Sequence, residues 1–284
     1  MRSFLASRQG AIIVRLSRGN TVTKHVLIFD SGVGGLSVYQ EIRKLLPDAT
    51  YTYLFDNARF PYGELSSEEL IPRCCALISA LQTQRPADLV VIACNTASTQ
   101  VLPTLRSQLS VPVVGVVPAI KPAAQLTRIG RIGLLATPAT VSRPYTEKLI
   151  REFASDCTVL RIGSTELVLE AERKLAGSAV DMNCLQRVLS PWLVDEQSPD
   201  VIILGCTHFP LLKEELHQVM PHVQLVDSGA AVARRVRSQL ELVPDRAQGG
   251  RESVAYCSKR DQNALRLTPA LNRFGFEILR ELSL

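Results

Sequence analysis

Short, almost continuously apolar runs alternate along this chain with segments of helical periodicity, and this alternation constrains the fold more than any other feature. Such runs are typical of strands that are buried on both faces. The predicted strands are Val26–Phe29, Tyr51–Phe55, Leu89–Ala93, Val113–Val117, Ile132–Ala136, Thr158–Ile162, Val201–Leu204, Leu225–Val226 and Val254–Cys257. Because strands that alternate with helices usually pair in parallel, the pattern predicts an α/β fold with mostly parallel sheets.

The segments between these runs carry helix signals. Leu36, Tyr39 and Ile42 share one face of a predicted helix. Ser66 with Glu69 has the spacing of a capping box and predicts a helix over Glu68–Leu81. Further helices are predicted over Leu211–Val219 and Ala230–Leu240.

The chain of 284 residues has room for about two domains, and its 46% hydrophobic and 21% charged residues exclude a disordered chain. No uncharged apolar run reaches the roughly 18 residues of a membrane span. The net charge of +5 equals the charge of residues 1–24 alone, so the remaining chain is neutral. The neutral charge of the chain outside these residues argues against a large surface for binding nucleic acid. We expect residues 1–24 to form a poorly ordered basic extension.

Seven cysteines without a secretory signal or metal-type spacing predict a reduced cytoplasmic protein with free thiols. Two of them end similar strands. Ala93-Cys94-Asn95-Thr96 has a counterpart in Gly205-Cys206-Thr207-His208, and Asp30-Ser31-Gly32 has one in Asp227-Ser228-Gly229. The two matches indicate a pair of related α/β halves that face each other.

Ligands of open α/β sheets bind at the carboxyl ends of strands, where Cys94 and Cys206 stand beside Asp30, Asp56 and Thr137. The Gly-rich segment 30–35 is neither a dinucleotide fingerprint nor a P-loop, and reads as a tight turn for a small anion or a plain turn into a helix. The two cysteines lack the CxxC spacing of a redox pair. A metal site made of Cys94, Cys206 and His208 would lack a fourth ligand.

A third use of two thiols is acid–base chemistry on the two faces of one carbon. Inverting an acidic C–H centre needs one base to remove the proton and a second group to deliver a proton to the other face. The two groups should be alike because their roles swap in the reverse direction. One must start as thiolate and the other as thiol.

Four segments together resemble the glutamate racemases, the cofactor-independent bacterial enzymes that make D-glutamate for peptidoglycan. They are Phe29-Asp30-Ser31-Gly32-Val33-Gly34-Gly35-Leu36, Pro61-Tyr62-Gly63, Ala93-Cys94-Asn95-Thr96-Ala97-Ser98 and Gly205-Cys206-Thr207-His208-Phe209-Pro210-Leu211-Leu212. The resemblance covers residues 25–284 and leaves the basic extension outside. The related aspartate and hydantoin racemases share the two-cysteine plan.

The resemblance implies site residues. Cys94 and Cys206 would be the two catalytic acid/bases, assisted by Asp30, His208 and Glu172, with Glu170 as the rival for the last position. The substrate would be held by Asp30, Ser31, Pro61, Tyr62, Gly63, Cys94, Asn95, Thr96, Thr137, Cys206, Thr207 and His208. No metal and no cofactor are expected.

The resemblance also implies two doubly wound, pseudo-symmetric α/β domains with the active site in the cleft between them. We expect the first domain to comprise 25–117 plus 230–284 and the second to comprise 118–229. The expected ligands are L-glutamate and D-glutamate. UDP-N-acetylmuramoyl-L-alanine is a possible activator near the Val117–Lys121 segment, although Lys121 can also be a solvated helix-end lysine.

Other functions stay open at this point. The substrate could be aspartate or another acidic compound, or the chain could bind a small molecule without catalysis. DNA gyrase is a possible second partner through the basic extension, with no membrane and no direct nucleic acid expected. The protein could be a monomer or a homodimer.

Overall fold

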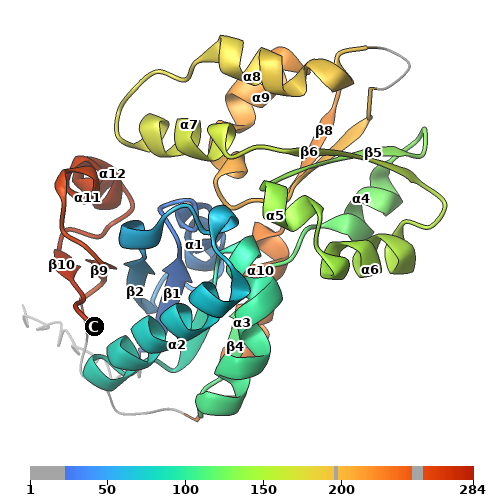
Figure 1. The fold of residues 1–284 in the computed structure, drawn as a ribbon. Coiled ribbons are helices and arrows are strands. Elements are labelled where there is room, and N and C mark those ends of the chain that lie inside the picture. The colour runs from blue at the N-terminus through green and yellow to red at the C-terminus, as the bar shows by residue number, and fades with distance from the viewer. Residues whose placement is uncertain (1–22, 195–197, 245–251) are drawn as a thin grey trace, which may run out of the picture.

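The computed structural model describes residues 23–194, 198–244 and 252–284. The predicted basic extension therefore lies outside the described residues, except for its last two positions. Two parallel sheets organise the chain, and Figure 1 shows them as two lobes with helices on both faces of each sheet.

The first sheet has six strands in the order β10-β9-β2-β1-β3-β4, and every neighbouring pair is parallel. The strands are β1 His25–Asp30, β2 Thr50–Phe55, β3 Leu89–Ile92, β4 Val113–Gly115, β9 Val254–Cys257 and β10 Leu279–Glu281. Alternate residues of β1 enter different cores: Val26 and Ile28 face one side of the sheet, and Leu27 and Phe29 face the other. Both faces are therefore covered, as the apolar runs predict.

The second sheet has four parallel strands in the order β6-β5-β7-β8. They are β5 Arg131–Ala136, β6 Thr158–Gly163, β7 Val201–Leu204 and β8 Gln224–Val226. This order repeats the β2-β1-β3-β4 part of the first sheet, so β3 and β7 occupy equivalent places. The two-lobed, mostly parallel α/β architecture predicted from the sequence is confirmed.

The helices connect the strands and lie on both faces of the sheets (Figure 1). They are α1 Leu36–Leu45, α2 Ser67–Gln84, α3 Asn95–Gln108, α4 Ile120–Leu126, α5 Pro138–Val141, α6 Pro144–Phe153, α7 Glu166–Leu175, α8 Met182–Leu189, α9 Lys213–Val219, α10 Gly229–Leu240, α11 Gln262–Arg266 and α12 Thr268–Arg273. Short 3₁₀ helices cover Asn57–Arg59, Tyr62–Glu64, Ser190–Trp192 and Phe209–Leu212.

Some sequence-based predictions of the elements were wrong in detail. Strand β4 ends at Gly115 and not at Val117, because the chain leaves the sheet there toward Pro118. The predicted helix 211–219 begins as a 3₁₀ turn and becomes α-helical at Lys213. Strand β10 was missed. The capping box is only half formed, since Ser66 Oγ accepts from the Glu69 N–H while the Glu69 carboxylate pairs with Arg59.

The Asp227-Ser228-Gly229 match is also wrong as a mark of symmetry. It follows β8, whose equivalent in the first sheet is β4, whereas Asp30-Ser31-Gly32 follows β1. The cysteine match does hold, because Cys94 follows β3 and Cys206 follows β7.

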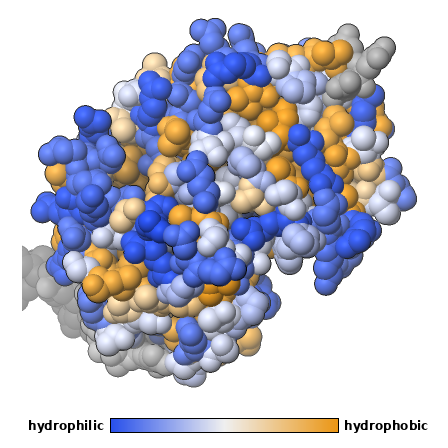
Figure 2. Space-filling model, in the orientation of Figure 1, coloured by the Kyte–Doolittle hydropathy of each residue, from blue (hydrophilic) through white to orange (hydrophobic). Residues whose placement is uncertain are grey.

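The chain passes between the two sheets after β4 and again after β8, and Ser228 Oγ donates to Val117 O where these passages meet. The domain boundaries at 117/118 and 229/230 stay a prediction. Hydrophilic residues cover much of the face in Figure 2, and apolar residues form separate patches between them. Within the described ranges, no helix is long and apolar enough to cross a bilayer.

Candidate active site

The two cysteines that follow β3 and β7 line one small cavity of about 20 Å³ between the sheets. Cys94 is the N-cap residue of α3, and both thiol residues are buried. The cavity is lined by Ser31, Pro61, Tyr62, Gly63, Cys94, Asn95, Thr96, Thr137, Val168, Cys206, Thr207 and His208. The structure thus brings all the predicted substrate-binding residues to one place except Asp30, which lies behind the cavity wall.

The cavity is closed by hydrogen bonds between the two lobes. The backbone N–H of Val33 donates to Glu172 Oε1 over 2.7 Å, and the backbone nitrogen of Gly34 is 3.2 Å from His208 Nε2. Ser37 Oγ donates to the Thr207 carbonyl over 2.8 Å. The glycine-rich turn after β1 therefore contacts the opposite lobe.

Cys94 lies in a dry and negatively charged environment. Its Sγ is 3.7 Å from Ser31 Oγ. Burial raises the pKa of the Cys94 thiol well above its usual range, and the nearby charge of Asp30 raises it further. Asp30 itself is fully buried, and burial raises the pKa of its carboxyl although Gly35 N–H and Ser31 N–H donate to it over 2.6 and 2.8 Å. This environment favours the thiol form of Cys94.

Cys206 has a different neighbourhood that can hold positive charge. Its Sγ is 3.7 Å from His208 Nδ1, and His208 Nε2 is 2.8 Å from Glu172 Oε1. Burial by itself lowers the pKa of His208, but the contacts with Cys206 and Glu172 outweigh it and raise this pKa well above the ordinary value. The two thiols are therefore chemically unequal.

The structure distinguishes Glu172 from Glu170, the two candidates for the glutamate that assists catalysis. Glu172 reaches His208, whereas the Glu170 carboxylate accepts from Asp181 N–H and pairs with Arg173, away from the thiols. Residues two apart on a helix point about 200° away from each other. The geometry favours Glu172 for the assisting position.

Polar groups without charge line the rest of the cavity. Asn95 Oδ1 is buried without a hydrogen-bond partner, so it is an acceptor open to a ligand N–H. The Thr96 hydroxyl is 3.2 Å from that of Thr137 and 3.4 Å from that of Thr140, so the three hydroxyls connect the lobes. The sequence analysis missed Thr140; its position three residues after the N-cap Thr137 could have revealed it.

No group of three or more metal-binding side chains is placed to hold an ion in the part of the chain that the structure describes. All seven cysteines are free. The arrangement offers two thiols from opposite walls, polar groups for an amino acid, and little room for water. It is suited to moving a proton at a carbon held between the thiols.

Comparisons with known proteins agree with this geometry. The family model for Asp/Glu/hydantoin racemases matches residues 28–236. Glutamate racemases of Salmonella paratyphi A and of an Escherichia coli strain are each 54% identical over 259 residues, or 91% of this chain and 92% and 91% of theirs.

Solved structures are similar in the same way. The E. coli glutamate racemase in complex with L-glutamate and the activator UDP-MurNAc-Ala has a TM-score of 0.90 and 53% identity, covering 92% of this chain and 98% of that one. An isoform from Bacillus anthracis has a TM-score of 0.74 and 27% identity, with 90% and 97% covered. This chain belongs to the Asp/Glu/hydantoin racemase family.

Proposed function

We propose that this protein interconverts L- and D-glutamate by removing and returning the α-proton with two thiols. The observation that carries the proposal is that Cys94 and Cys206 enter one closed cavity from equivalent strands of the two sheets. The identity of 54% to glutamate racemases supports glutamate as the substrate over aspartate or another acid. The product D-glutamate would serve peptidoglycan synthesis.

In the proposed mechanism, one thiolate takes the α-proton while the other thiol donates to the opposite face. The α-carbon is far less acidic than a thiol, so the site must stabilise a carbanion-like transition state with fixed dipoles in a dry cavity. Asn95 Oδ1 is placed to accept from the substrate ammonium group. The hydroxyls of Ser31, Thr96, Thr137 and Thr207 line the cavity and would donate to the two carboxylates. No cofactor takes part in this scheme.

The test is to incubate each enantiomer with the protein in D₂O and follow α-deuteration together with optical rotation. Exchange accompanied by inversion supports the proposal, and L- and D-aspartate serve as the competing substrates. A folded protein that binds glutamate but never exchanges its α-proton would instead be a binding protein.

Replacing Gly34 by alanine should reduce the activity by roughly 10²-fold, the usual cost of displacing a catalytic group by about 1 Å. A Cβ at this position would come within 2.6 Å of His208 Cγ, and the ring is 2% exposed, so it has little room to withdraw. The measurement is kcat for both enantiomers together with a thermal unfolding curve. An activity within threefold of the wild type would show that the lobes need not approach this closely.

Replacing Asp30 by asparagine should move the alkaline limb of the kcat/KM profile to lower pH. The charge of Asp30 is one of the causes that raise the pKa of Cys94, so removing it lowers that pKa. The singly protonated thiol pair, which is the active form, then loses its last proton at lower pH. Because the enantiomers have equal free energy, kcat/KM and its profile should be the same in both directions. A limb that stays in place would mean that Asp30 is uncharged.

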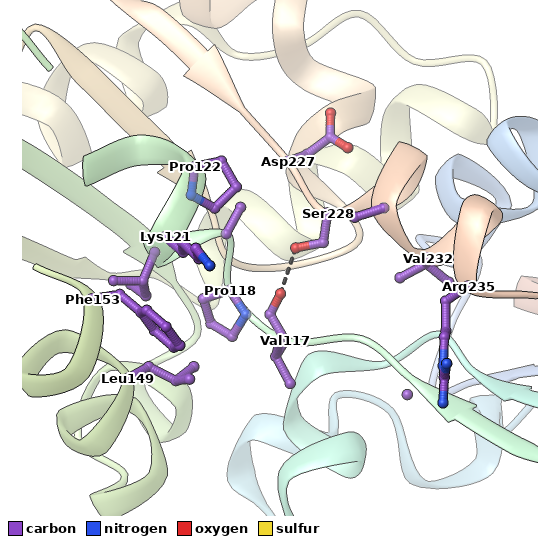
Figure 3. Close-up of a pocket in the computed structure, with 14 residues that line it drawn as sticks. Val117, Pro118, Lys121, Pro122, Leu149, Phe153, Asp227, Ser228, Val232 and Arg235 are labelled. Carbon is purple, nitrogen blue, oxygen red and sulfur yellow. Dashed lines mark hydrogen bonds between the residues drawn. The ribbon is translucent and has the colours of Figure 1, made fainter. Parts of the chain in front are cut away.

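We also propose that a cell-wall precursor, UDP-N-acetylmuramoyl-L-alanine, activates the protein from a cavity at the passages between the lobes. The E. coli relative was solved with this activator. Here a cavity of about 280 Å³ lies beside the Ser228–Val117 hydrogen bond (Figure 3), with Lys121 and Arg235 among its lining residues. Lys121 is exposed, and its Nζ is 5.5 Å from the centre of the Phe153 ring. An adjoining cavity of about 550 Å³ adds Arg106.

If the two cations bind the diphosphate, Lys121→Ala and Arg235→Ala should each raise the half-activating concentration by about tenfold, since a hydrogen bond to a charged group contributes about 1.5–3 kcal/mol. Arg234→Ala removes a neighbouring exposed charge that does not line the cavity, and should leave the value unchanged. Equal values for all three variants would place the activator elsewhere.

The remaining partner predictions are untested. Binding of DNA gyrase would involve residues 1–24, and gyrase inhibition by the protein without them is the measurement that checks it. The oligomeric state, monomer or homodimer, and the cytoplasmic location also stay predictions.

A further inference from the structure

Glu172 on α7 stands between the active-site cavity and a second cavity. Its Oε1 is bound by His208 and by Val33 N–H, yet 16% of its side chain remains exposed. The second cavity has a volume of about 410 Å³ and lies between α7 and the C-terminal helix α11. Its lining includes Gly32, Phe60, Leu169, Glu172, Asp261 and Leu267, and neither reacting thiol. Figure 1 shows α11 and α12 beside one end of α7.

A continuous line of proton-carrying groups joins Cys206 to this cavity. Cys206 Sγ is 3.7 Å from one nitrogen of the His208 ring, and Glu172 Oε1 is 2.8 Å from the other. Imidazole can accept a proton at one nitrogen and release one from the other. His208 Nε2 has a partner in either state, because it can donate to Glu172 when protonated and accept from Gly34 N–H, at 3.2 Å, when not.

Cys94 has no equivalent series of proton-carrying groups in the described part of the chain. Its hydroxyl neighbour Ser31 lines the same active-site cavity as the thiol itself. The nearby Asp30 carboxylate has no exposed surface and is bound by the N–H groups of Ser31 and Gly35, with the Thr207 hydroxyl at 3.4 Å. Neither an imidazole nor a partly exposed carboxylate therefore connects Cys94 to a second cavity.

We propose that a proton taken up by Cys206 leaves the closed site through His208 and Glu172 into the second cavity, while a proton on Cys94 stays inside. With the His208 ring neutral and protonated at Nε2, Cys206 Sγ–H gives its proton to Nδ1, Nε2 gives its proton to the Glu172 carboxylate, and the carboxyl releases one to water. One proton passes from thiol to water, no bond to carbon changes in this step, and no electron is transferred. The inference rests on the proposed racemase function.

The two enantiomers should consequently differ in how often the α-proton returns to the carbon it came from. When Cys206 is the base, its new proton exchanges with solvent before it can return, so unreacted substrate acquires deuterium in D₂O. When Cys94 is the base, the original proton is kept and returns unexchanged. The ratio of α-deuteration in remaining substrate to inversion should therefore be higher for one enantiomer.

The experiment measures this ratio at early times for L- and D-glutamate separately, by chiral separation and mass spectrometry. In the wild type we expect the two ratios to differ. Glu172→Gln should lower the higher ratio by roughly 10²-fold, the lower end of what a positioned proton-transfer group supplies, and leave the other unchanged. Because the ratio compares two fates of one intermediate, a general loss of activity does not alter it. Glu172→Asp, which keeps a carboxylate, should restore part of the difference.

Glu170→Gln is the matched control, since Glu170 is also a glutamate of α7 but is buried and binds Arg173 and Asp181 N–H. It should leave both ratios as in the wild type. Equal ratios for the two enantiomers in the wild type, or an unchanged difference in Glu172→Gln, would overturn the proton route. Absence of any inversion would instead contradict the racemase function itself.

Discussion

Replacing either Cys94 or Cys206 by serine should lower the rate of racemisation by on the order of 10³-fold or more, within the range for loss of a positioned acid or base. Each thiol serves one face of the α-carbon, so the loss of one stops both directions. A serine hydroxyl keeps nearly the same volume but is a far weaker acid than a thiol, so it neither ionises nor donates as readily. The measurement is the initial rate of optical rotation change from each enantiomer.

Cys157→Ser is the control, because this cysteine lies at the end of the second sheet's α6–β6 connection and lines no part of the thiol cavity. It should keep the wild-type rate. The double variant Cys94→Ser/Cys206→Ser should be little slower than either single one, since groups that act as a unit are not additive. A single serine variant that keeps a tenth of the activity would refute the two-thiol mechanism.

The sequence identified both thiols because their chemistry is set by local context. Each follows a buried parallel strand, where ligands of open α/β sheets bind, and each is followed by Asn-Thr or Thr-His. Cys257 also ends a buried parallel strand but has no such neighbours. The alternation of buried strands and amphipathic helices likewise predicted the α/β class. Both signals lie within a few consecutive residues, which is why they can be read without coordinates.

Features that depend on packing between distant segments could not be predicted in this way. The contacts of Val33 and Gly34 with the opposite lobe join residues more than a hundred positions apart. The proton route from His208 through Glu172 to the second cavity also depends on distant segments, because the other wall of that cavity is made by the C-terminal helix α11. Strand β10 was missed because it has only three residues, two of them exposed, and so lacks the apolar run of a central strand.

Asp56 stands at a strand end that the sequence analysis singled out, and its role appears only in the structure. Replacing it by alanine should destabilise the fold by about 3–5 kcal/mol, because four hydrogen bonds to its carboxylate are lost at about 1 kcal/mol each. Its carboxylate is fully buried after β2 and accepts from Arg73 Nε and Nη2 over 2.5 and 2.7 Å. Tyr62 OH and Ser258 Oγ also donate to it, over 2.6 and 2.5 Å. Urea unfolding at neutral pH measures the loss.

Glu69→Ala is the comparison, because the Glu69–Arg59 pair lies at the surface with about half of each side chain exposed. An exposed pair contributes about 0–1 kcal/mol, so this variant should unfold close to the wild type. Asp56→Asn keeps the shape and part of the hydrogen bonding, and should fall between the two. If Asp56→Ala loses no more stability than Glu69→Ala, the hydrogen bonds to Asp56 do not stabilise the fold.

The same network also has a consequence for the active site, because Tyr62 and Gly63 line the thiol cavity while the Tyr62 hydroxyl is held by Asp56. Tyr62→Phe removes that hydroxyl and leaves the Asp56–Arg73 pair in place, so it separates the two effects. We expect it to cost about 1 kcal/mol of stability, the value of one hydrogen bond, and to raise KM more than it lowers kcat. A carboxylate that never touches the substrate would then set both the stability of the first lobe and the position of one wall of the site.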